Sequence, residues 1–179
     1  MLTAQQVQQD LEKLRDIVIA LKSPESDLAT TTKVINGIEL NVFAKVPDNL
    51  RGVYKLGLEA ADKDFLVYED ERFTFAQSLH TAEAMSQVLL RRYGIKKGDR
   101  VAVCSRNYPE WCLAYMAITM IGAIVVPMNS WWQSNELVYG IKDSGTRVLF
   151  ADQERIDQLL PVIDQVDVEV IAIKPSKPD

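Results

Sequence analysis

Four short runs in the second half of the chain are almost entirely apolar and show no alternation with polar residues. They occupy residues 100–104, 123–126, 147–151 and 168–173. A strand without polar alternation is typical of a parallel sheet that is covered by helices on both faces. We therefore predict four buried strands, and we expect the run at residues 123–126 to be covered on both faces.

Segments with helical periodicity separate these strands. Helices are predicted over residues 75–93, 107–121 and 134–145, and a fourth begins after Asp152 and is shortened by Pro161. We expect four residues of the fourth helix to point inward, namely Ile156, Leu159, Leu160 and Ile163. Alternating strands and helices with short connections predict an α/β fold with three layers, in which helices flank a mostly parallel, doubly wound sheet.

Residue types at the helix ends predict where these helices begin and stop. Asn107, followed three residues later by Glu110, resembles a capping box, and Ser134 and Asp152 are good first caps. Gly122 is a natural stop for the second helix.

The first quarter of the chain is patterned differently. Residues 3–22 predict a helix with a narrow apolar stripe, which either docks on the body of the protein or self-associates. Residues 22–27 are linker-like, and residues 38–44 alternate weakly, as an edge strand does. A short helix over residues 50–61 and a small β-hairpin formed by residues 65–68 and 72–75 complete the predicted elements.

The overall composition argues against several classes of function. The chain has 179 residues, of which 47% are hydrophobic, and a net charge of −5, which gives no electrostatic case for nucleic acid. The first 22 residues contain neither a signal peptide nor a membrane span, so we expect no membrane span and a cytoplasmic protein. Cys104 and Cys112 lie in apolar segments and are interpreted as buried thiols in a reducing compartment.

Well-known catalytic motifs are absent from the sequence. It contains no GxGxxG after a strand, no GxxxxGK[ST], no GxSxG and no HExxH, so dinucleotide, P-loop, serine hydrolase and zinc chemistry all lack support. The single histidine, His80, has no nucleophile motif beside it and is interpreted as a surface residue. We predict no catalytic residue and no metal ligand from these residue patterns.

One loop remains a candidate ligand site. Pro127 ends the second strand because it has no N–H for a central ladder, and the chain then enters a loop at the carboxyl end of that strand. In open α/β sheets this edge is where ligands bind. Our candidate residues for a ligand-binding loop are Asn129, Ser130, Trp131 and Trp132. The alternative is that the two tryptophans only pack the domain, and we expect consecutive tryptophans to differ in exposure.

Several stretches resemble the core motifs of the AMP-forming adenylating enzymes, which include acyl- and aryl-CoA ligases, luciferases and peptide-synthetase adenylation domains. FTFAQSL at residues 73–79 resembles the first core motif, and AITMIGAIVVPMN at residues 117–129 resembles the second. Between and after them, YGIKKGDRVAV, NYPEW and DSGTRVL begin at residues 93, 107 and 143 and are similar to the family's connecting segments. The likeness runs continuously over residues 48–152, with the motifs in the family's order.

The resemblance implies an enzyme that joins a carboxylic acid to ATP, releases pyrophosphate and passes the acyl group to CoA. It implies ATP, Mg²⁺ and CoA for the full-length enzyme, with a fatty or medium-chain acid as substrate and a role in lipid metabolism. It also implies that the loop of Asn129, Ser130, Trp131 and Trp132 lies on the side that binds the acyl group and CoA. The family's phosphate loop, acidic magnesium position, hinge aspartate and catalytic lysine lie downstream of these motifs and are not found here. We therefore expect an inactive N-terminal fragment that binds none of these cofactors tightly.

The expected organisation is a helix and linker over residues 1–27, followed by a partial adenylating domain over residues 28–179 that is truncated at its C-terminal end. A non-catalytic binding or interaction domain of the same fold is the alternative. A truncated domain exposes apolar surface, so we also expect self-association, for example as a homodimer.

Overall fold

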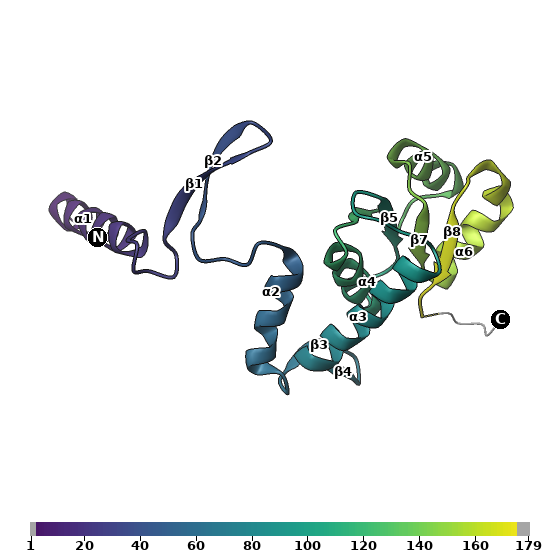
Figure 1. Cartoon of the computed structure of the whole chain (residues 1–179), viewed down its shortest axis with the longest axis horizontal. Helices are drawn as coiled ribbons and strands as arrows, with labels where there is room; N and C mark the ends of the chain where they lie inside the picture. The colour runs from purple at the N-terminus through teal and green to yellow at the C-terminus, as the bar shows by residue number, and fades with distance from the viewer. Residues whose placement is uncertain (1–2, 175–179) are drawn as a thin grey trace. The chain divides into compact units, whose positions relative to one another are not determined.

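The computed structural model describes residues 3–174 of the chain. The chain divides into two compact units, residues 1–48 and residues 49–179, which we describe separately (Figure 1).

The first unit contains a helix and a two-stranded hairpin. Helix α1 spans Ala4–Leu21 as predicted, and Thr3 and Gln6 cap its first turn reciprocally. Strands β1 (Thr30–Ile35) and β2 (Ile38–Phe43) pair antiparallel. The sequence interpretation found only the second strand of this hairpin.

The hairpin turn carries the signal that would have revealed the first strand. Asn36 and Gly37 both have positive φ angles, 51° and 80°. Two left-handed residues in succession are typical of a type I′ turn, for which Asn-Gly is the strongest short sequence signal. The dipeptide was visible in the sequence, but the weak alternation before it concealed the hairpin.

The second unit contains the remaining helices and strands. In chain order they are α2 (Leu50–Leu56), the 3₁₀ helix η1 (Gly57–Ala60), β3 (Asp64–Tyr68), β4 (Glu71–Thr74), α3 (Phe75–Arg91), β5 (Arg100–Cys104), α4 (Pro109–Met120), β6 (Ile124–Pro127), α5 (Ser134–Ser144), β7 (Val148–Ala151), α6 (Gln153–Leu159), the 3₁₀ helix η2 (Leu160–Gln165) and β8 (Glu169–Ala172). Strands β3 and β4 form the predicted small hairpin.

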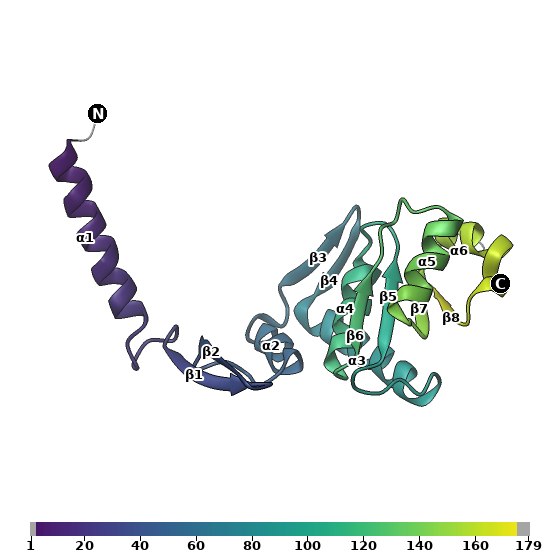
Figure 2. The ribbon, with the colours of Figure 1, turned by 90° about the horizontal axis from the view of Figure 1, so that it is seen from above.

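The central sheet is parallel throughout, with strand order β6-β5-β7-β8 (Figure 2). Alternate residues of β5 point to opposite faces of the sheet. Val101 and Val103 pack with residues of α3 and α4, whereas Ala102 and Cys104 pack with residues of α5 and α6. Because both faces are buried, β5 needs no polar alternation. This confirms the predicted three-layer α/β fold.

The expected burial is wrong for the two outer strands. Strand β6 lies at one edge of the sheet, and Ile124 is 51% exposed, while Val125 and Val126 are half-buried. Strand β8 forms the other edge, and none of its residues is fully buried. An apolar run indicates burial but says nothing about the strand's position in the sheet order. At its edge of the sheet, the helix layers cover β6 only in part.

Two predicted helix starts are also wrong. Helix α4 begins at Pro109 with Tyr108 as its N-cap, so Asn107 lies one residue too early to cap it. Proline fixes the helical φ angle and has no N–H to satisfy, so it favours the first helical position. Ser134 is the first residue of α5, and the Gln133 N–H donates to the Glu136 carboxylate at 2.8 Å.

Other predicted ends are confirmed. Gly122 and Gly145 have φ angles of 75° and 62° where α4 and α5 end, and Asp152 caps α6. Pro161 lies in the 3₁₀ helix that follows α6, and this tighter helix turns Leu160 outward, 58% exposed, although we expected it to point inward.

Candidate functional site

The strand order creates a switch point at the carboxyl edge of the sheet. The chain leaves β5 for β6 on one side, then crosses to β7 on the other side of β5. Ligands of open parallel sheets bind where neighbouring connections diverge in this way. The loops that meet here are residues 105–108 after β5, residues 128–133 after β6, and the turn that begins at Asp152 after β7. We call this region the carboxyl-edge site.

A buried ion pair lies at the centre of the carboxyl-edge site. Arg155 is 1% exposed and Asp152 is 4% exposed. The Arg155 Nη1 donates to both Asp152 carboxylate oxygens, at 3.1 and 3.2 Å. Burial alone would lower the pKa of Arg155, but its hydrogen bonds to Asp152 and Glu154 outweigh this effect and raise it. The guanidinium therefore stays charged.

This ion pair connects all three loops. The Asp152 carboxylate accepts a hydrogen bond from the Arg106 backbone N–H at 2.9 Å. The Arg155 Nε donates to the Ser130 carbonyl oxygen at 2.7 Å. One buried salt bridge thus fixes the backbone of both the loop after β5 and the loop after β6.

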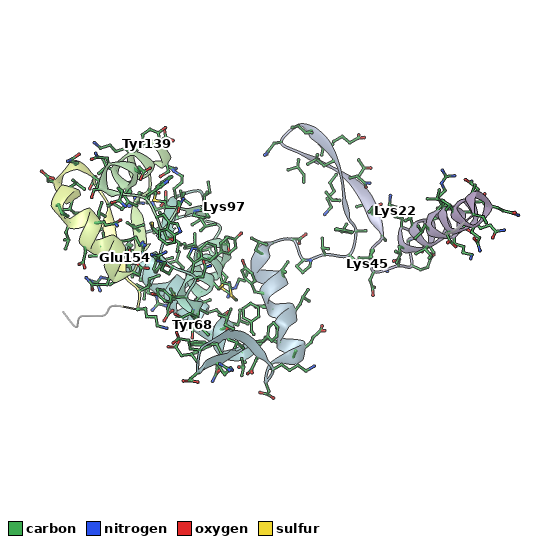
Figure 3. All side chains as sticks on the ribbon, turned by 180° about the vertical axis from the view of Figure 1, so that it is seen from behind. Lys22, Lys45, Tyr68, Lys97, Tyr139 and Glu154 are labelled. Carbon is green, nitrogen blue, oxygen red and sulfur yellow. The ribbon has the colours of Figure 1, made fainter. Side chains whose placement is uncertain are left out.

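The outer part of the site contains a tryptophan, an arginine and a carboxylate. The Arg106 guanidinium lies over the Trp131 ring, 3.8 Å from its centroid. Glu154, labelled in Figure 3, contacts both arginines, with its Oε2 3.5 Å from Arg106 Nη2 and 2.8 Å from Arg155 Nη1. The Trp131 side chain is 69% exposed, so this stacked pair faces solvent.

The two tryptophans differ in exposure, as expected. Trp132 is half-buried and packs on the core against α5, where a Cβ added to Gly140 would lie 2.6 Å from the Trp132 ring. The Asn129 Oδ1 accepts from the Trp131 N–H at 2.9 Å, and the Asn129 carbonyl accepts from the Trp132 N–H at 3.1 Å. Asn129 therefore sets the turn that directs the two indoles to different sides.

The thiol groups and the single imidazole of the chain do not form a nucleophilic centre. Cys104 is fully buried, and burial raises the pKa of its thiol to about 12, so it stays protonated at neutral pH. Cys112 is only partly buried, which departs from the expectation for it. His80 is exposed, as predicted. Within residues 3–174, no group of three or more His, Cys, Asp or Glu side chains is placed to hold a metal ion.

The structure brings the four candidate residues to one edge together with residues that sequence reasoning missed. The missed residues are Glu154 and Arg155. Asp152 was interpreted only as a helix cap, although its position directly after a strand was visible. Nothing in the sequence signals that Arg155 points inward, because Arg is rarely buried.

The side chains of the carboxyl-edge site are better arranged to bind a ligand than to catalyse a reaction. Its charged groups are paired with one another, while the exposed Trp131 ring offers a flat apolar surface. Such a surface can stack on a planar group.

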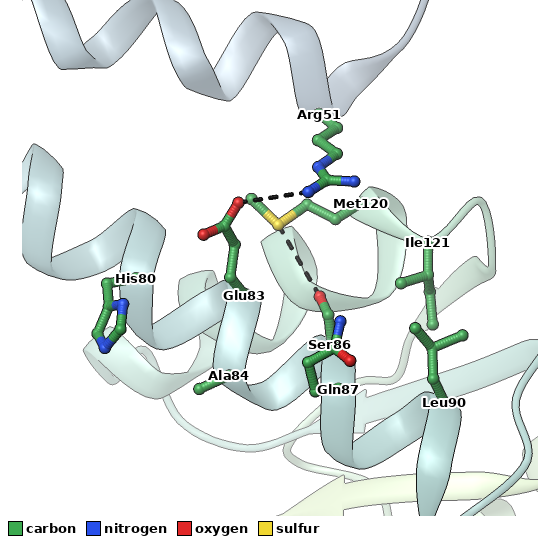
Figure 4. Close-up of a pocket in the computed structure, with 9 residues that line it drawn as sticks. All are labelled: Arg51, His80, Glu83, Ala84, Ser86, Gln87, Leu90, Met120 and Ile121. Atoms are coloured by element: carbon green, nitrogen blue, oxygen red, sulfur yellow. Dashed lines mark hydrogen bonds and ion pairs between the residues drawn. The ribbon is translucent and has the colours of Figure 1, made fainter.

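A second cavity lies away from this edge, between α2, α3 and the end of α4 (Figure 4). It measures about 370 Å³, and Arg51 and Glu83 form an ion pair of 3.6 Å at its side. Ser86 and Met120 line it, and the Ser86 hydroxyl is already satisfied by the carbonyl oxygens of Ala82 and Ala117. The polar groups of Arg51, Glu83 and Ser86 are thus engaged in local contacts.

The fold and the carboxyl-edge site define an α/β domain built to present loops at the switch point of a parallel sheet. The family of AMP-binding enzymes matches residues 57–178, most of the second unit. The chain belongs to this family. This confirms the resemblance stated from the core motifs.

Two of the similar proteins are CoA ligases. The chain is 30% identical to 4-hydroxybutyrate–CoA ligase 2 of Metallosphaera sedula over 118 residues, which cover 65% of this chain and 21% of that protein. It is 32% identical to the mitochondrial medium-chain acyl-CoA ligase ACSF2 of Bos taurus over 118 residues, 64% of this chain and 19% of that protein. It spans about a fifth of the length of either relative.

A solved structure shows the same fold. The N-terminal domain of FACL13 from Mycobacterium tuberculosis superposes with a TM-score of 0.65 and 25% identity, covering 70% of this chain and 34% of that one. No helix in the described part of the chain combines the length and apolar character that a membrane span requires.

Proposed function

We propose that the chain is the N-terminal part of an ATP-dependent acid–CoA ligase. Such an enzyme joins a carboxylic acid to ATP, releases pyrophosphate and transfers the acyl group from the adenylate to CoA. The observation that carries the proposal is the family match over residues 57–178, together with relatives that include CoA ligases. Within this proposal residues 1–27 are a helix and linker, and residues 28–179 are part of the adenylating domain.

The proposed substrate is a fatty or medium-chain acid. The relative named for medium-chain acids supports this choice, since it is as similar to the chain as the relative named for 4-hydroxybutyrate. The longer enzyme would use ATP, Mg²⁺ and CoA.

The carboxyl-edge site is the part of this chain that we propose contacts ligand. Asn129, Ser130, Trp131 and Trp132 form its loop on the acyl and CoA side. Trp131 fits a planar group, because its indole is 69% exposed and the Arg106 guanidinium packs against the ring. Asp152 and Arg155 are buried, so their role is to hold the loops.

The chain by itself is proposed to be inactive. Stabilising the charge that develops on the departing pyrophosphate requires donors and a metal placed in advance, and such preorganised electrostatics supply a large part of catalysis. The charged groups of the carboxyl-edge site are committed to internal pairs. In the resemblance stated above, the phosphate loop and the catalytic lysine belong to later segments of the longer enzyme.

The test is acid-dependent exchange of labelled pyrophosphate into ATP, measured for the purified chain and for a longer product if the gene continues. We expect the reading frame to continue past codon 179 into a Ser/Thr/Gly-rich segment, exchange by the longer product with a fatty or medium-chain acid, and none by residues 1–179. Robust exchange by residues 1–179, abolished by a mutation within them, would locate the chemistry here instead. A stop codon directly after Asp179 would favour a non-catalytic domain of this fold.

A further inference from the structure

The ammonium group of Lys174 lies between two tyrosine rings at the end of strand β8. Its Nζ is 4.3 Å from the centroid of the Tyr68 ring and 5.1 Å from that of Tyr108. The two rings meet edge to face, with centroids 5.6 Å apart and an interplanar angle of 82°. Two aromatic surfaces on one cation are typical of sites that recognise ammonium groups. Figure 3 labels Tyr68.

One carboxylate contacts this cation, and a second acts on it only through its charge. The Lys174 Nζ is 2.9 Å from Glu71 Oε1. Glu110 acts on Lys174 through its charge, and its Oε2 is buried without a hydrogen-bond partner among the described residues. The hydrogen bond to Glu71 raises the pKa of Lys174 despite partial desolvation, and the charge of Glu110 adds to this effect.

The surrounding groups come from separate parts of the second unit. Tyr68 ends β3 and Glu71 begins β4, Tyr108 and Glu110 lie at the start of α4, and Lys174 follows β8. Tyr68 and Tyr108 also line an apolar cavity of about 340 Å³, whose other walls include Leu66, Trp111 and Cys112. An exposed ion pair alone would be worth little, but here one cation contacts two rings and a carboxylate beside an apolar space.

We propose that Tyr68, Tyr108 and Glu71 form a binding site for an alkylammonium group, which Lys174 fills from within the chain. The ligand class is a primary amine with a short apolar tail. Its ammonium takes the position of the Lys174 Nζ, and its tail enters the cavity beside Trp111. While Lys174 occupies the site, it holds the end of β8 against the β3–β4 hairpin.

The proposal is tested by removing the Lys174 ammonium group from the site. Lys174→Met removes the ammonium and keeps an unbranched apolar side chain. n-Butylammonium chloride is titrated into this variant and followed by calorimetry and by NMR shifts of the tyrosine rings. We expect saturable binding about tenfold tighter than to the unchanged chain, where the tethered ammonium competes at a high effective concentration. Lys63→Met is the matched control, since Lys63 is exposed and contacts neither tyrosine, and should leave binding as weak as in the unchanged chain.

Selectivity and location are tested in the same background. n-Pentanol, a neutral molecule of similar length, and sodium chloride at equal ionic strength should not reproduce the binding. Adding Tyr68→Leu to Lys174→Met should abolish it. Equal binding of n-butylammonium by the Lys174→Met variant and the unchanged chain, or equal binding of n-pentanol, would overturn the proposal.

A measurement on the unchanged chain tests the proposal even if the Lys174→Met variant does not fold. The ε-methylene protons of Lys174 should be shifted upfield by the ring currents of the two tyrosines, and this signal should be missing from Lys174→Met. An unshifted Lys174 signal, at the position of the exposed lysines, would show that the rings do not hold the ammonium and would also overturn the proposal.

Discussion

At the scale of single residues, Arg155 has the most demanding environment in the described chain. A guanidinium prefers water, yet this one is buried and depends on Asp152, Glu154 and the Ser130 carbonyl for all of its compensation. Buried ion pairs are costly to break because the remaining partner keeps its desolvation penalty. The loops of the carboxyl-edge site therefore depend on this one side chain.

Arg155→Met should lower the free energy of unfolding by about 3–5 kcal/mol, because it leaves Asp152 buried without its cation. Urea unfolding followed by circular dichroism measures the change. Arg147→Met is the control, since Arg147 pairs with Asp99 on the surface and is 53% exposed. That pair should contribute less than about 1 kcal/mol. Equal losses in the two variants would contradict the central role of Arg155.

Trp131 and Trp132 should be separable by iodide quenching of variants that retain a single tryptophan. Trp131 is 69% exposed and should be quenched strongly, whereas Trp132 packs against α5 and should be protected.

Gly140→Ala extends this test. The new Cβ would lie 2.6 Å from the Trp132 ring, so the indole has to move outward and its quenching should rise. The quenching of Trp131 should stay unchanged, which serves as the internal control. Strong and equal quenching of both tryptophans in the unchanged protein would mean that the loop is not held as described.

At the scale of elements, the central sheet was predictable because its strands are apolar on both faces. Helix layers on both sides remove the need for polar alternation, so β5 and β7 appear in the sequence as uninterrupted apolar runs. No such pattern indicates the position of a strand in the sheet. Strand β6 has the same composition as its neighbours but lies at the edge, and only the three-dimensional pairing shows it.

The wrongly predicted start of α4 has a local cause. Asn107 has the right chemistry for a cap, but Pro109 fixes the start of α4 two residues later. The candidate loop could be located because it follows a strand, and the carboxyl edge is general to such sheets. The ion pair that holds the loop could not be predicted, since its two residues look like the ordinary first turn of a surface helix.

Substitutions to aspartate should separate the centre of the sheet from its edge. Val103→Asp places a carboxylate in β5 where the native side chain is 0% exposed, and it should cost several kcal/mol or prevent folding, because the charge has no partner. Ile124→Asp, in β6 where the side chain is 51% exposed, should cost less than about 1 kcal/mol beyond the lost apolar contact. Thermal unfolding compares the two. A severe loss at Ile124 would show that the edge of β6 is covered in solution.

At the scale of the whole molecule, the notable feature is the amount of apolar surface on α1. Its stripe residues are all exposed, by between 43% and 57%, and they are Val7, Leu11, Leu14, Val18 and Leu21. Contiguous exposed apolar surface marks a binding or association site. An amphipathic helix of 18 residues with this spacing can pair with a second copy of itself through the same stripe.

We therefore expect dimers or larger species in sedimentation velocity at micromolar concentration. Replacing Leu11 and Leu14 together with Glu should shift the protein toward monomer, because charges would lie at the centre of the stripe. Gln5→Glu with Gln9→Glu is the matched control, since it adds the same charge to α1 off the stripe and should leave association unchanged.

If both double variants dissociate equally, net charge and not the stripe controls association. If the unchanged protein is monomeric at high concentration, the stripe is satisfied within one chain, and the expectation of self-association is wrong.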